Sequence, residues 1–293
     1  MEIIRSGQAS ENITEGCLVL EGGAFRGLYS QGALDALMEN DLNFSCVIGV
    51  SAGALSGLNY CSGQIGRSAR INLSYRHDSR YVGIRALREA HSPVNLDFIL
   101  KDVNAIEPFN WKCFNNPERR FVAVCANVET GEVEYFEKNN CDILSAVKAS
   151  ASMPYISPEV IVDGKPCLDG GTCCKIPYQW AIDQGYDKIV VIRTRDRTFR
   201  KKNMTKENEL ADVYYRHNQR FAKALADSNI NYNRQCDELI KLEKQRRIYV
   251  IAPQKPVTVS RVEADLEKLG DLYLEGYQET CEQIEKLREY LRK

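Results

Sequence analysis

The stretch FSCVIGVSAG, residues 44–53, decides the fold that this sequence predicts. Its first seven residues form a short apolar run, which is typical of a buried strand. The run leads directly into Ser51-Ala52-Gly53 and then into a segment rich in Ala, Leu and Gly, which predicts a helix. A strand that passes through a tight turn into a helix is typical of a parallel sheet covered by helices.

The same order of elements is expected on both sides of this stretch. Upstream, residues 17–20 predict a strand, residues 21–27 a glycine-rich turn and residues 28–39 a helix. Downstream, the pattern predicts strands at 121–128, 131–136 and 188–192, and helices at 142–150 and 177–184. Asp163-Gly164 lies between the apolar runs 160–162 and 166–168, and an Asp-Gly pair in that position is a strong hairpin signal.

The last third of the chain has a different character. Basic residues crowd into positions 193–202, and charged helices are expected at 207–227 and 231–244. A strand at 248–252 and an amphipathic end from about residue 262 follow. Since no repeat or low-complexity linker separates these segments from the rest, we expect them to pack on the core.

Composition narrows the function. The 293 residues carry a formal net charge of −1, so nothing indicates a nucleic-acid partner. The first 16 residues lack the apolar segment of a secretory signal, and no run of about 18 apolar residues would span a bilayer. The 11 cysteines form no C-x-x-C pair, which favours free thiols and a cytoplasmic location. Any membrane contact is expected to be peripheral.

Gly49, Ser51 and Gly53 form a G-x-S-x-G motif between the predicted strand and helix. In a nucleophile elbow of this kind, the serine occupies a strained turn and its hydroxyl projects from the top of the sheet. The glycines leave room where Cβ atoms would clash. Ser51 is therefore the candidate nucleophile, and a tight turn without chemistry is the alternative.

A second glycine-rich turn, EGGAFRG at residues 21–27, also joins a strand to a helix. Its backbone N–H groups are expected to converge on one point and bind an anion or a tetrahedral oxyanion. It lacks the Lys-Ser/Thr pair of a Walker A loop and the G-x-G-x-x-G spacing of a dinucleotide fold. A tight turn that allows close packing is the alternative.

Asp169-Gly170-Gly171 supplies a carboxylate as candidate base, although a simple hairpin corner would give the same pattern. The chain order Ser51, Asp169, His217 imitates the triad of α/β-hydrolases. However, the elbow follows only two predicted strands, and His217 lies in a charged run expected to be a solvated helix face. With His77 and His91 as the other histidines, these observations favour a Ser–Asp dyad.

These motifs together resemble the patatin-like phospholipase family. That family has a D-G-G-G-x-R-G loop, a G-x-S-x-G elbow and a D-G-G/A motif, which here read EGGAFRG, GVSAG and DGG in the same order. Ala149 to Pro154 also looks like the Ala-Ser-rich segment of the family. Glu21 replaces the usual Asp, and Ala24 replaces the third Gly.

The resemblance implies Ser51 as nucleophile and Asp169 as base. It implies an oxyanion hole formed by the turn residues Gly22, Gly23, Ala24, Arg26 and Gly27, in which backbone N–H groups donate and Arg26 braces the loop. Gly49, Gly53, Gly170 and Gly171 support these motifs. The expected fold is a three-layer α/β/α core with a mainly parallel central sheet. Residues 1–16 are expected as a lead-in, 17–194 as the catalytic core and 195–293 as a mainly helical extension.

The function implied is hydrolysis of lipid acyl esters by a bacterial serine hydrolase that needs no metal or organic cofactor. A carboxylesterase for soluble esters and a regulatory binding protein with a silent dyad remain as alternatives. The sequence indicates no oligomeric state. A further hypothesis is that the basic residues 193–202 contact anionic headgroups and that Phe109, Trp111 and Phe114 line an acyl entrance, against a solvated loop and a small core cluster.

Overall fold

A central sheet of eight strands organises the protein. The computed structural model describes residues 4–202 and 205–292. The strand order is β10-β9-β2-β3-β5-β8-β7, and β6 also pairs with β5. The strands of this sheet are β2 (Thr14–Leu20), β3 (Phe44–Val50), β5 (Arg120–Asn127), β6 (Val133–Glu137), β7 (Val160–Val162), β8 (Lys165–Asp169), β9 (Ile189–Ile192) and β10 (Tyr249–Ile251). Two short strands, β1 (Gly7–Gln8) and β4 (Gln64–Ile65), pair with each other.

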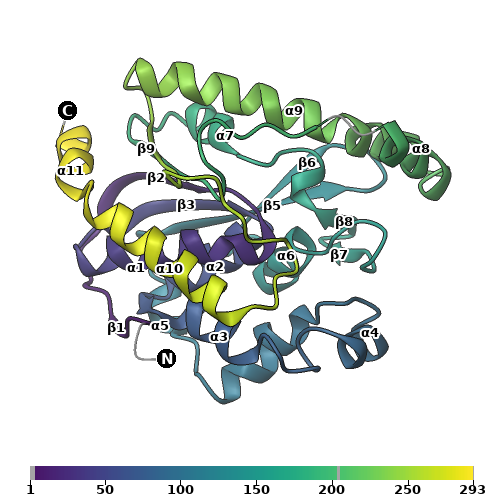
Figure 1. The fold of residues 1–293 in the computed structure, drawn as a ribbon, viewed down its shortest axis with the longest axis horizontal. Coiled ribbons are helices and arrows are strands. Elements are labelled where there is room, and N and C mark those ends of the chain that lie inside the picture. Colours follow the sequence, from purple (N-terminus) through teal and green to yellow (C-terminus); the bar gives the residue numbers. More distant parts are fainter. Residues whose placement is uncertain (1–3, 203–204, 293) are drawn as a thin grey trace.

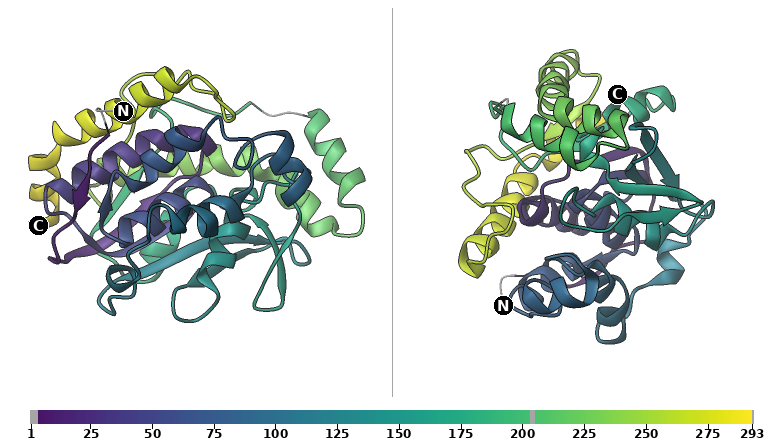
Figure 2. Two further views of the ribbon diagram at one scale, coloured as in Figure 1. Left: turned by 90° about the horizontal axis from the view of Figure 1, so that it is seen from below. Right: turned by 90° about the vertical axis from the view of Figure 1, so that its right-hand side faces the viewer.

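Helices cover both faces of this sheet (Figures 1 and 2). One face packs against α1 (Gly27–Glu39), α2 (Ala52–Cys61), α6 (Ile143–Ser150) and α10 (Leu266–Cys281), and the other against α7 (Tyr178–Asp183) and α9 (Gln219–Lys244). The remaining α-helices are α3 (Arg67–Tyr75), α4 (Ile84–Ala90), α5 (Trp111–Phe114), α8 (Thr205–Tyr214) and α11 (Ile284–Arg292). In Figure 1 and in the right view of Figure 2, α3 and α4 lie on the side of α1 and α2 that faces away from α9.

Alternation along the strands explains the two cores. On β2, Leu18 and Leu20 join the cluster beneath α1 and α2, whereas Cys17 and Val19 join the cluster beneath α7 and α9. Successive side chains of a strand point to opposite faces, so a central strand covered on both sides is apolar throughout. The uninterrupted apolar run in β3 has the same cause, and all seven of its residues are buried.

The sheet is parallel from β10 to β5 and antiparallel among β5, β6, β7 and β8. This arrangement confirms the predicted three-layer α/β/α fold with a mainly parallel sheet and C-terminal helices.

The C-terminal helices pack tightly on the core. Helix α10 crosses α1 so closely that a Cβ atom on Gly32 would overlap the carbonyl oxygen of Tyr273. Likewise, a Cβ atom on Gly276 would overlap the carbonyl oxygen of Tyr29. Small residues at a helix crossing allow the two backbones to approach. No helix among the described residues has the length and apolar character needed to cross a bilayer.

The predicted division of the charged helices was wrong. The sequence pattern places a break between residues 227 and 231, but α9 runs through that stretch without interruption. The break instead follows α8, at residues 215–218. Phe221, Ala222, Ser228 and Tyr232 form one continuous buried face of α9. Burial of this face outweighs the weak local helix propensity of the polar residues around 228–231.

Candidate active site

Ser51 occupies a strained turn between β3 and α2. Its backbone angles are φ 57° and ψ −125°, which a residue with a side chain rarely adopts. A Cβ atom on Gly49 would lie 2.5 Å from the carbonyl carbon of Gly53, and one on Gly53 would lie 2.5 Å from the carbonyl oxygen of Leu20. Both glycines are therefore required for α2 to start directly against β2 and β3.

The sheet register brings Ser51 and Asp169 together although 118 positions separate them. Strand β3 runs along β5 until Val50 lies opposite Val124. Strand β8 approaches from the opposite direction along the same edge, and its last residue, Asp169, lies opposite Cys125. Since Val124 and Cys125 are adjacent on β5, the ends of β3 and β8 meet. The hydroxyl that follows Val50 therefore faces the Asp169 carboxylate.

The resulting contact is a direct hydrogen bond. Ser51 Oγ donates to Asp169 Oδ2 at 2.7 Å. The other carboxylate oxygen accepts from the Gly171 N–H at 2.7 Å, and the Asp169 N–H donates to the carbonyl of Ser152 at 2.7 Å. Burial raises the pKa of Asp169 above its ordinary value, while the bonds from Ser51 and Gly171 oppose that rise. The arrangement has the geometry required of a nucleophile and its base.

Gly170 allows the turn after Asp169 to lie against the sheet, since a Cβ atom there would overlap the carbonyl oxygen of Val124.

A serine that sequence reasoning did not single out holds the elbow from the same side. Ser150 Oγ accepts from the Ser51 N–H at 2.9 Å and donates to the carbonyl of Val124 at 2.6 Å. Ser150 is fully buried, so this bridge is protected from water. The Ala-Ser-rich segment in the sequence was the available signal.

The glycine-rich turn lies directly beside the elbow. A Cβ atom on Gly22 would lie 3.0 Å from Ser51 Cβ, and one on Gly27 would lie 3.2 Å from Ala52 Cβ. Within the described part of the chain, no hydrogen bond engages the backbone N–H groups of Gly22, Gly23 and Ala24. Ala24 adopts φ 50°, the left-handed conformation that glycine tolerates best. These N–H groups are thus available to a developing negative charge near Ser51.

Residues that follow β9 in the chain hold the glycine-rich turn in place. Thr194 Oγ1 donates to the carbonyl of Gly22 at 3.1 Å, and the Thr194 N–H donates to Glu21 Oε2 at 2.7 Å. Glu21 lies 3.8 Å from the fully buried guanidinium of Arg193. Arg26 is also buried, but its Nε has no hydrogen-bond partner among the described residues. Burial, together with Arg195 and Arg261, lowers the pKa of Arg26 to about 10.

Two of the three histidines form hydrogen bonds away from the dyad. His77 Nε2 is 2.8 Å from the carbonyl oxygen of Ala264, and His217 accepts from Arg216 Nε at 3.0 Å. His217 is exposed in the turn after α8, so its predicted position on a helix face was wrong. Neither His77 nor His217 bonds to Ser51 or Asp169. Among the side chains described, those of residues 4–202 and 210–292, no cluster of three His, Cys, Asp or Glu is placed to hold a metal ion.

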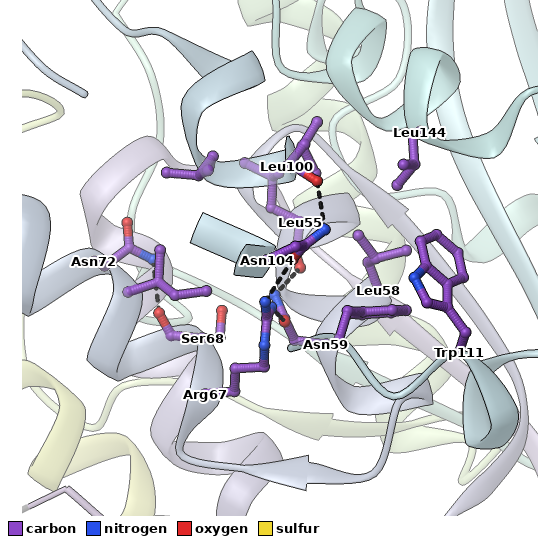
Figure 3. Close-up of a pocket in the computed structure, with 13 residues that line it drawn as sticks. Leu55, Leu58, Asn59, Arg67, Ser68, Asn72, Leu100, Asn104, Trp111 and Leu144 are labelled. Carbon is purple, nitrogen blue, oxygen red and sulfur yellow. Dashed lines mark hydrogen bonds between the residues drawn. The ribbon is translucent and has the colours of Figure 1, made fainter. Parts of the chain in front are cut away.

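An apolar pocket lies beside α2, one helical turn beyond Ser51 (Figure 3). Leu55, Leu58 and Leu144 line one part of it. Its polar part holds Arg67, whose Nη2 donates to Asn104 Oδ1 at 2.7 Å. The other lining residues are Asn59, Ser68, Ile71, Asn72, Ile99, Leu100, Phe109 and Trp111. Helices α2 and α6 carry these leucines. Helix α2 begins beside the elbow, and helix α6 ends beside it.

Two of the three aromatic residues expected at an acyl entrance line this pocket. Phe109 and Trp111 stack edge to face there, with ring centres 4.7 Å apart. Phe114 does not line the pocket; it is fully buried and packs against Phe121.

The basic stretch 193–202 is largely turned into the protein. Arg193 is 1% exposed, Arg197 pairs with Glu243 at 2.7 Å, and Arg200 pairs with Asp237 at 2.6 Å. The stretch is therefore a loop, as expected, but only partly solvated, with Thr198 and Lys202 exposed. Its contact with anionic headgroups stays a prediction.

Comparisons with known proteins fit these motifs. A family model described as patatin-like phospholipase matches residues 18–182, and a second model, a domain of unknown function called DUF6363, matches residues 218–292. The chain is 26% identical over 183 residues to the uncharacterized protein YjjU of Escherichia coli strain K12. This match covers 60% of the chain and 51% of YjjU, so the chain spans about half the length of this relative.

Two solved structures are also similar. VipD from Legionella pneumophila is 13% identical, with a TM-score of 0.48 over 97% of this chain and 70% of that one. The type III effector protein ExoU is 12% identical, with a TM-score of 0.39 over 98% of this chain and 54% of that one.

Proposed function

The chain belongs to the patatin-like phospholipase family, and we propose that it cleaves the acyl esters of lipids through a Ser51–Asp169 dyad and an acyl-enzyme. The observation that carries this proposal is the 2.7 Å hydrogen bond from Ser51 Oγ to Asp169 Oδ2 at a strained elbow. A hydroxyl in that position is activated when the carboxylate accepts its proton.

The reaction proceeds in two steps. Ser51 Oγ attacks the acyl carbonyl as its proton passes to Asp169, and the carbonyl oxygen becomes an oxyanion. The unengaged N–H groups of Gly22, Gly23 and Ala24 stabilise this charge. Collapse of the intermediate expels the alcohol, which takes the proton from Asp169, and leaves an acyl-Ser51 ester. Water then attacks the ester while Asp169 takes its proton, and Asp169 returns that proton to Ser51 Oγ as the fatty acid leaves.

The pocket beside α2 is our candidate for the acyl chain of the substrate. Leu55 lies one turn of α2 from the nucleophile, Leu144 lies on α6, and the aromatic rim of the pocket includes Trp111, which is 41% exposed. Burial of an acyl chain stabilises a complex by about 0.8 kcal/mol per methylene. We therefore assign this pocket to the acyl chain.

The test uses purified wild-type protein and Ser51→Ala. We expect the wild type to react with a fluorophosphonate at Ser51 and to release fatty acid from mono- or diacyl lipids. Ser51→Ala should lose several orders of magnitude in kcat and keep its circular dichroism spectrum. Residual activity within tenfold of wild type would exclude Ser51 as nucleophile. A wild type that neither labels nor hydrolyses any ester would support the regulatory alternative.

A further inference from the structure

Lys175 lies beside the turn that carries the proposed base, and the mechanism above does not use it. It is the sixth residue after Asp169. Its Nζ donates to the carbonyl of Gly171. A Cβ atom on Gly171 would lie 2.9 Å from Asp169 Oδ1 and 3.8 Å from Lys175 Cγ. Gly171 therefore has both the carboxylate of the base and the stem of the lysine as neighbours.

Ser228, a buried residue of α9, completes this contact. Its Oγ accepts from Lys175 Nζ and donates to the carbonyl of Gly171 at 3.2 Å. Its own carbonyl also accepts from Lys175 Nζ, at 3.4 Å. The carbonyl of Gly171 thus has two donors, and one of them comes from α9. The charged ammonium is the stronger donor of the two.

Gln235 forms a second contact between α9 and this segment. It lies seven residues after Ser228, about two helical turns, so both residues lie on one face of the helix. Gln235 Oε1 accepts from the N–H of Lys175 at 3.3 Å, and its Nε2 donates to the carbonyl of Ile176 at 3.1 Å. In Figure 1, α9 runs along the same side of the sheet as α7, the next helix after this segment. Helix α9 therefore holds residues 171–176 at two points.

The turn that α9 holds also orients the base. The peptide unit between Gly170 and Gly171 donates its N–H to Asp169 Oδ1 at 2.7 Å. Its carbonyl, that of Gly170, accepts from the N–H of Cys174 at 2.8 Å. Because Oδ1 is held in this way, Oδ2 is left to accept from Ser51. A shift of the turn would therefore turn the carboxylate away from the nucleophile.

The charge of Lys175 also acts on the base. Burial raises the pKa of Asp169, and the hydrogen bonds from Ser51 and Gly171 oppose that rise. The positive charges of Lys175 and Arg261 oppose it as well. A nearby positive charge favours the ionised form of a carboxylate, which is the form that can accept the proton of the nucleophile.

Lys175 keeps its own charge at neutral pH. Burial lowers its pKa to about 8, against the opposing effect of Asp169. Since this pKa remains above neutrality, most of the lysine is protonated there. The other titratable groups that interact with its charge are Cys173, Cys174, Lys201 and Arg261.

We propose that Lys175 is a positioning residue for the base, and that α9 holds it in place through Ser228. Together they fix the carbonyl of Gly171, so that the carboxylate of Asp169 keeps its orientation toward Ser51. A catalytic group must be held within about 0.5 Å of its working position, and hydrogen bonds from neighbouring residues provide this support. A misplacement of about 1 Å can cost about 10²-fold in rate.

The proposal assigns a role in catalysis to the C-terminal part of the chain. Helix α9 lies within residues 218–292, which the family model of unknown function matches, and beyond residues 18–182, which the phospholipase model matches. Its contacts with residues 171–176 join the two matched regions at the base. This inference rests on the proposed function, because the orientation of Asp169 affects the rate only if Asp169 is the base.

The test compares Lys175→Met, Lys175→Arg and Ser228→Ala with the control Lys223→Met. Lys175→Met keeps an unbranched side chain but loses the charge and the donors, whereas Lys175→Arg keeps both. Lys223 also lies on α9, but it is exposed and pairs with Asp227. The assay measures kcat and KM on a p-nitrophenyl ester as a function of pH. Circular dichroism establishes that each variant folds.

We expect Lys175→Met to lower kcat by about 10–100-fold and to keep KM within about threefold of wild type, because the lysine positions the base rather than the ester. The rise of kcat/KM with pH should move to higher pH, since the pKa of Asp169 rises when the opposing positive charge is lost. Lys175→Arg should keep the wild-type position of this rise and a higher kcat than Lys175→Met.

Ser228→Ala removes one hydrogen bond and leaves the charge of the lysine. We expect it to lower kcat by about threefold to tenfold and to keep the pH at which kcat/KM rises. Lys223→Met should keep the wild-type kcat and KM. Ala favours the helical conformation, so Ser228→Ala remains decisive even if Lys175→Met does not fold. A folded Ser228→Ala with the wild-type kcat would overturn the role of α9.

Other results would overturn the role of Lys175. A folded Lys175→Met whose kcat/KM rises at the wild-type pH would overturn it whatever its kcat, because a structural role alone would then explain any loss. A raised KM with an unchanged kcat would make Lys175 a substrate contact instead. Equal loss in Lys223→Met would attribute the effect to the general stability of α9.

Failure of the proposed function itself would look different. The wild type would then neither react with the fluorophosphonate at Ser51 nor hydrolyse any ester, which would refute both proposals. A wild type that labels and hydrolyses esters, with every variant at the wild-type rate, would confine the failure to the positioning role of Lys175.

Discussion

Replacement of Asp169 by Asn separates a Ser–Asp dyad from a histidine-dependent triad. Asn has nearly the same shape as Asp, but one of its two terminal atoms is a hydrogen-bond donor. The Gly171 N–H lies 2.7 Å from Oδ1 and requires an acceptor there. The amide nitrogen of Asn would therefore occupy the Oδ2 position and face Ser51 Oγ, which would lose its proton acceptor.

The expected loss follows from this geometry. General-base catalysis contributes about 10²–10⁴-fold, and here the same carboxylate also orients the nucleophile at 2.7 Å. We expect Asp169→Asn to lower kcat/KM by about 10³–10⁴, or about 4–5.5 kcal/mol of transition-state stabilisation. A p-nitrophenyl ester assay gives kcat/KM, and circular dichroism with a thermal melt reports whether the variant remains folded.

The histidine variants are the matched comparison. His77→Ala, His91→Ala and His217→Ala should each retain activity within about tenfold, since none is asked to move the proton. A folded His217→Ala as inactive as Ser51→Ala would refute the dyad and return the chain to the general class of serine hydrolases. Activity of Asp169→Asn within tenfold of wild type would refute it as well.

The pH profile gives an independent check on Asp169. The base must be ionised, and burial raises its pKa above the ordinary value of 3.8. The kcat/KM of the wild type should therefore rise with pH through a pKa above 3.8 and then level off. Asp169→Asn should lose this rise of kcat/KM with pH. A rise that persists in the variant would show that another group titrates.

Three more outcomes are expected. Gly23→Val should lower kcat by about 10²–10³ in ester assays, because its Cβ would lie 2.6 Å from Thr194 Oγ1 and displace the oxyanion donors; a change in KM alone would contradict this. Burial raises the pKa of Asp35 to about 7 from 3.8, so the stability that this one group contributes is full below pH 3.8 and is lost, by up to about 4 kcal/mol, as pH rises to 7. Urea unfolding of Asp35→Asn should lack that slope. Leu144→Trp should reduce hydrolysis of long-chain esters more than of short-chain esters. Equal loss would show that this pocket does not hold the acyl chain.

Sequence reasoning succeeded where the signal is local. The expected strand at residues 44–50 matches β3, and the Asp163-Gly164 hairpin forms between β7 and β8. Each depends on a few adjacent residues whose apolar pattern and turn chemistry agree. The α/β class follows from the repeated order of strand, turn and helix, because that order leaves few ways to bury both faces of a sheet.

The meeting of Ser51 with Asp169 could not be derived from such patterns. It depends on β8 running antiparallel to β5 and ending opposite Cys125. A register shifted by one residue would turn the carboxylate to the other face of the sheet. Nothing in the residues around DGG specifies that register, and before the family resemblance a hairpin corner was an equal alternative.

Long-range burial accounts for the error at residues 227–231 and for the partial burial of residues 193–202. A cluster of basic residues in sequence usually marks a solvated surface. Arg193 is buried here because Glu21 lies 3.8 Å from its guanidinium and Tyr232 accepts from Nη2 at 3.1 Å. The partners come from the first strand–helix junction and from α9, so no local window contains them.

At position 21 this chain has Glu where the family pattern has Asp, and this glutamate connects the glycine-rich loop to residues that follow β9. The resemblance gives Asp at this position, and the extra methylene of Glu lengthens the arm of the carboxylate. Glu21 Oε2 accepts from the N–H of Thr194 and lies 3.8 Å from Arg193, and both of these residues fall beyond residue 182. Thr194 in turn bonds to the carbonyl of Gly22. The buried glutamate thus ties the glycine loop to the segment that follows β9, so residues beyond the matched phospholipase model hold the loop in position beside Ser51.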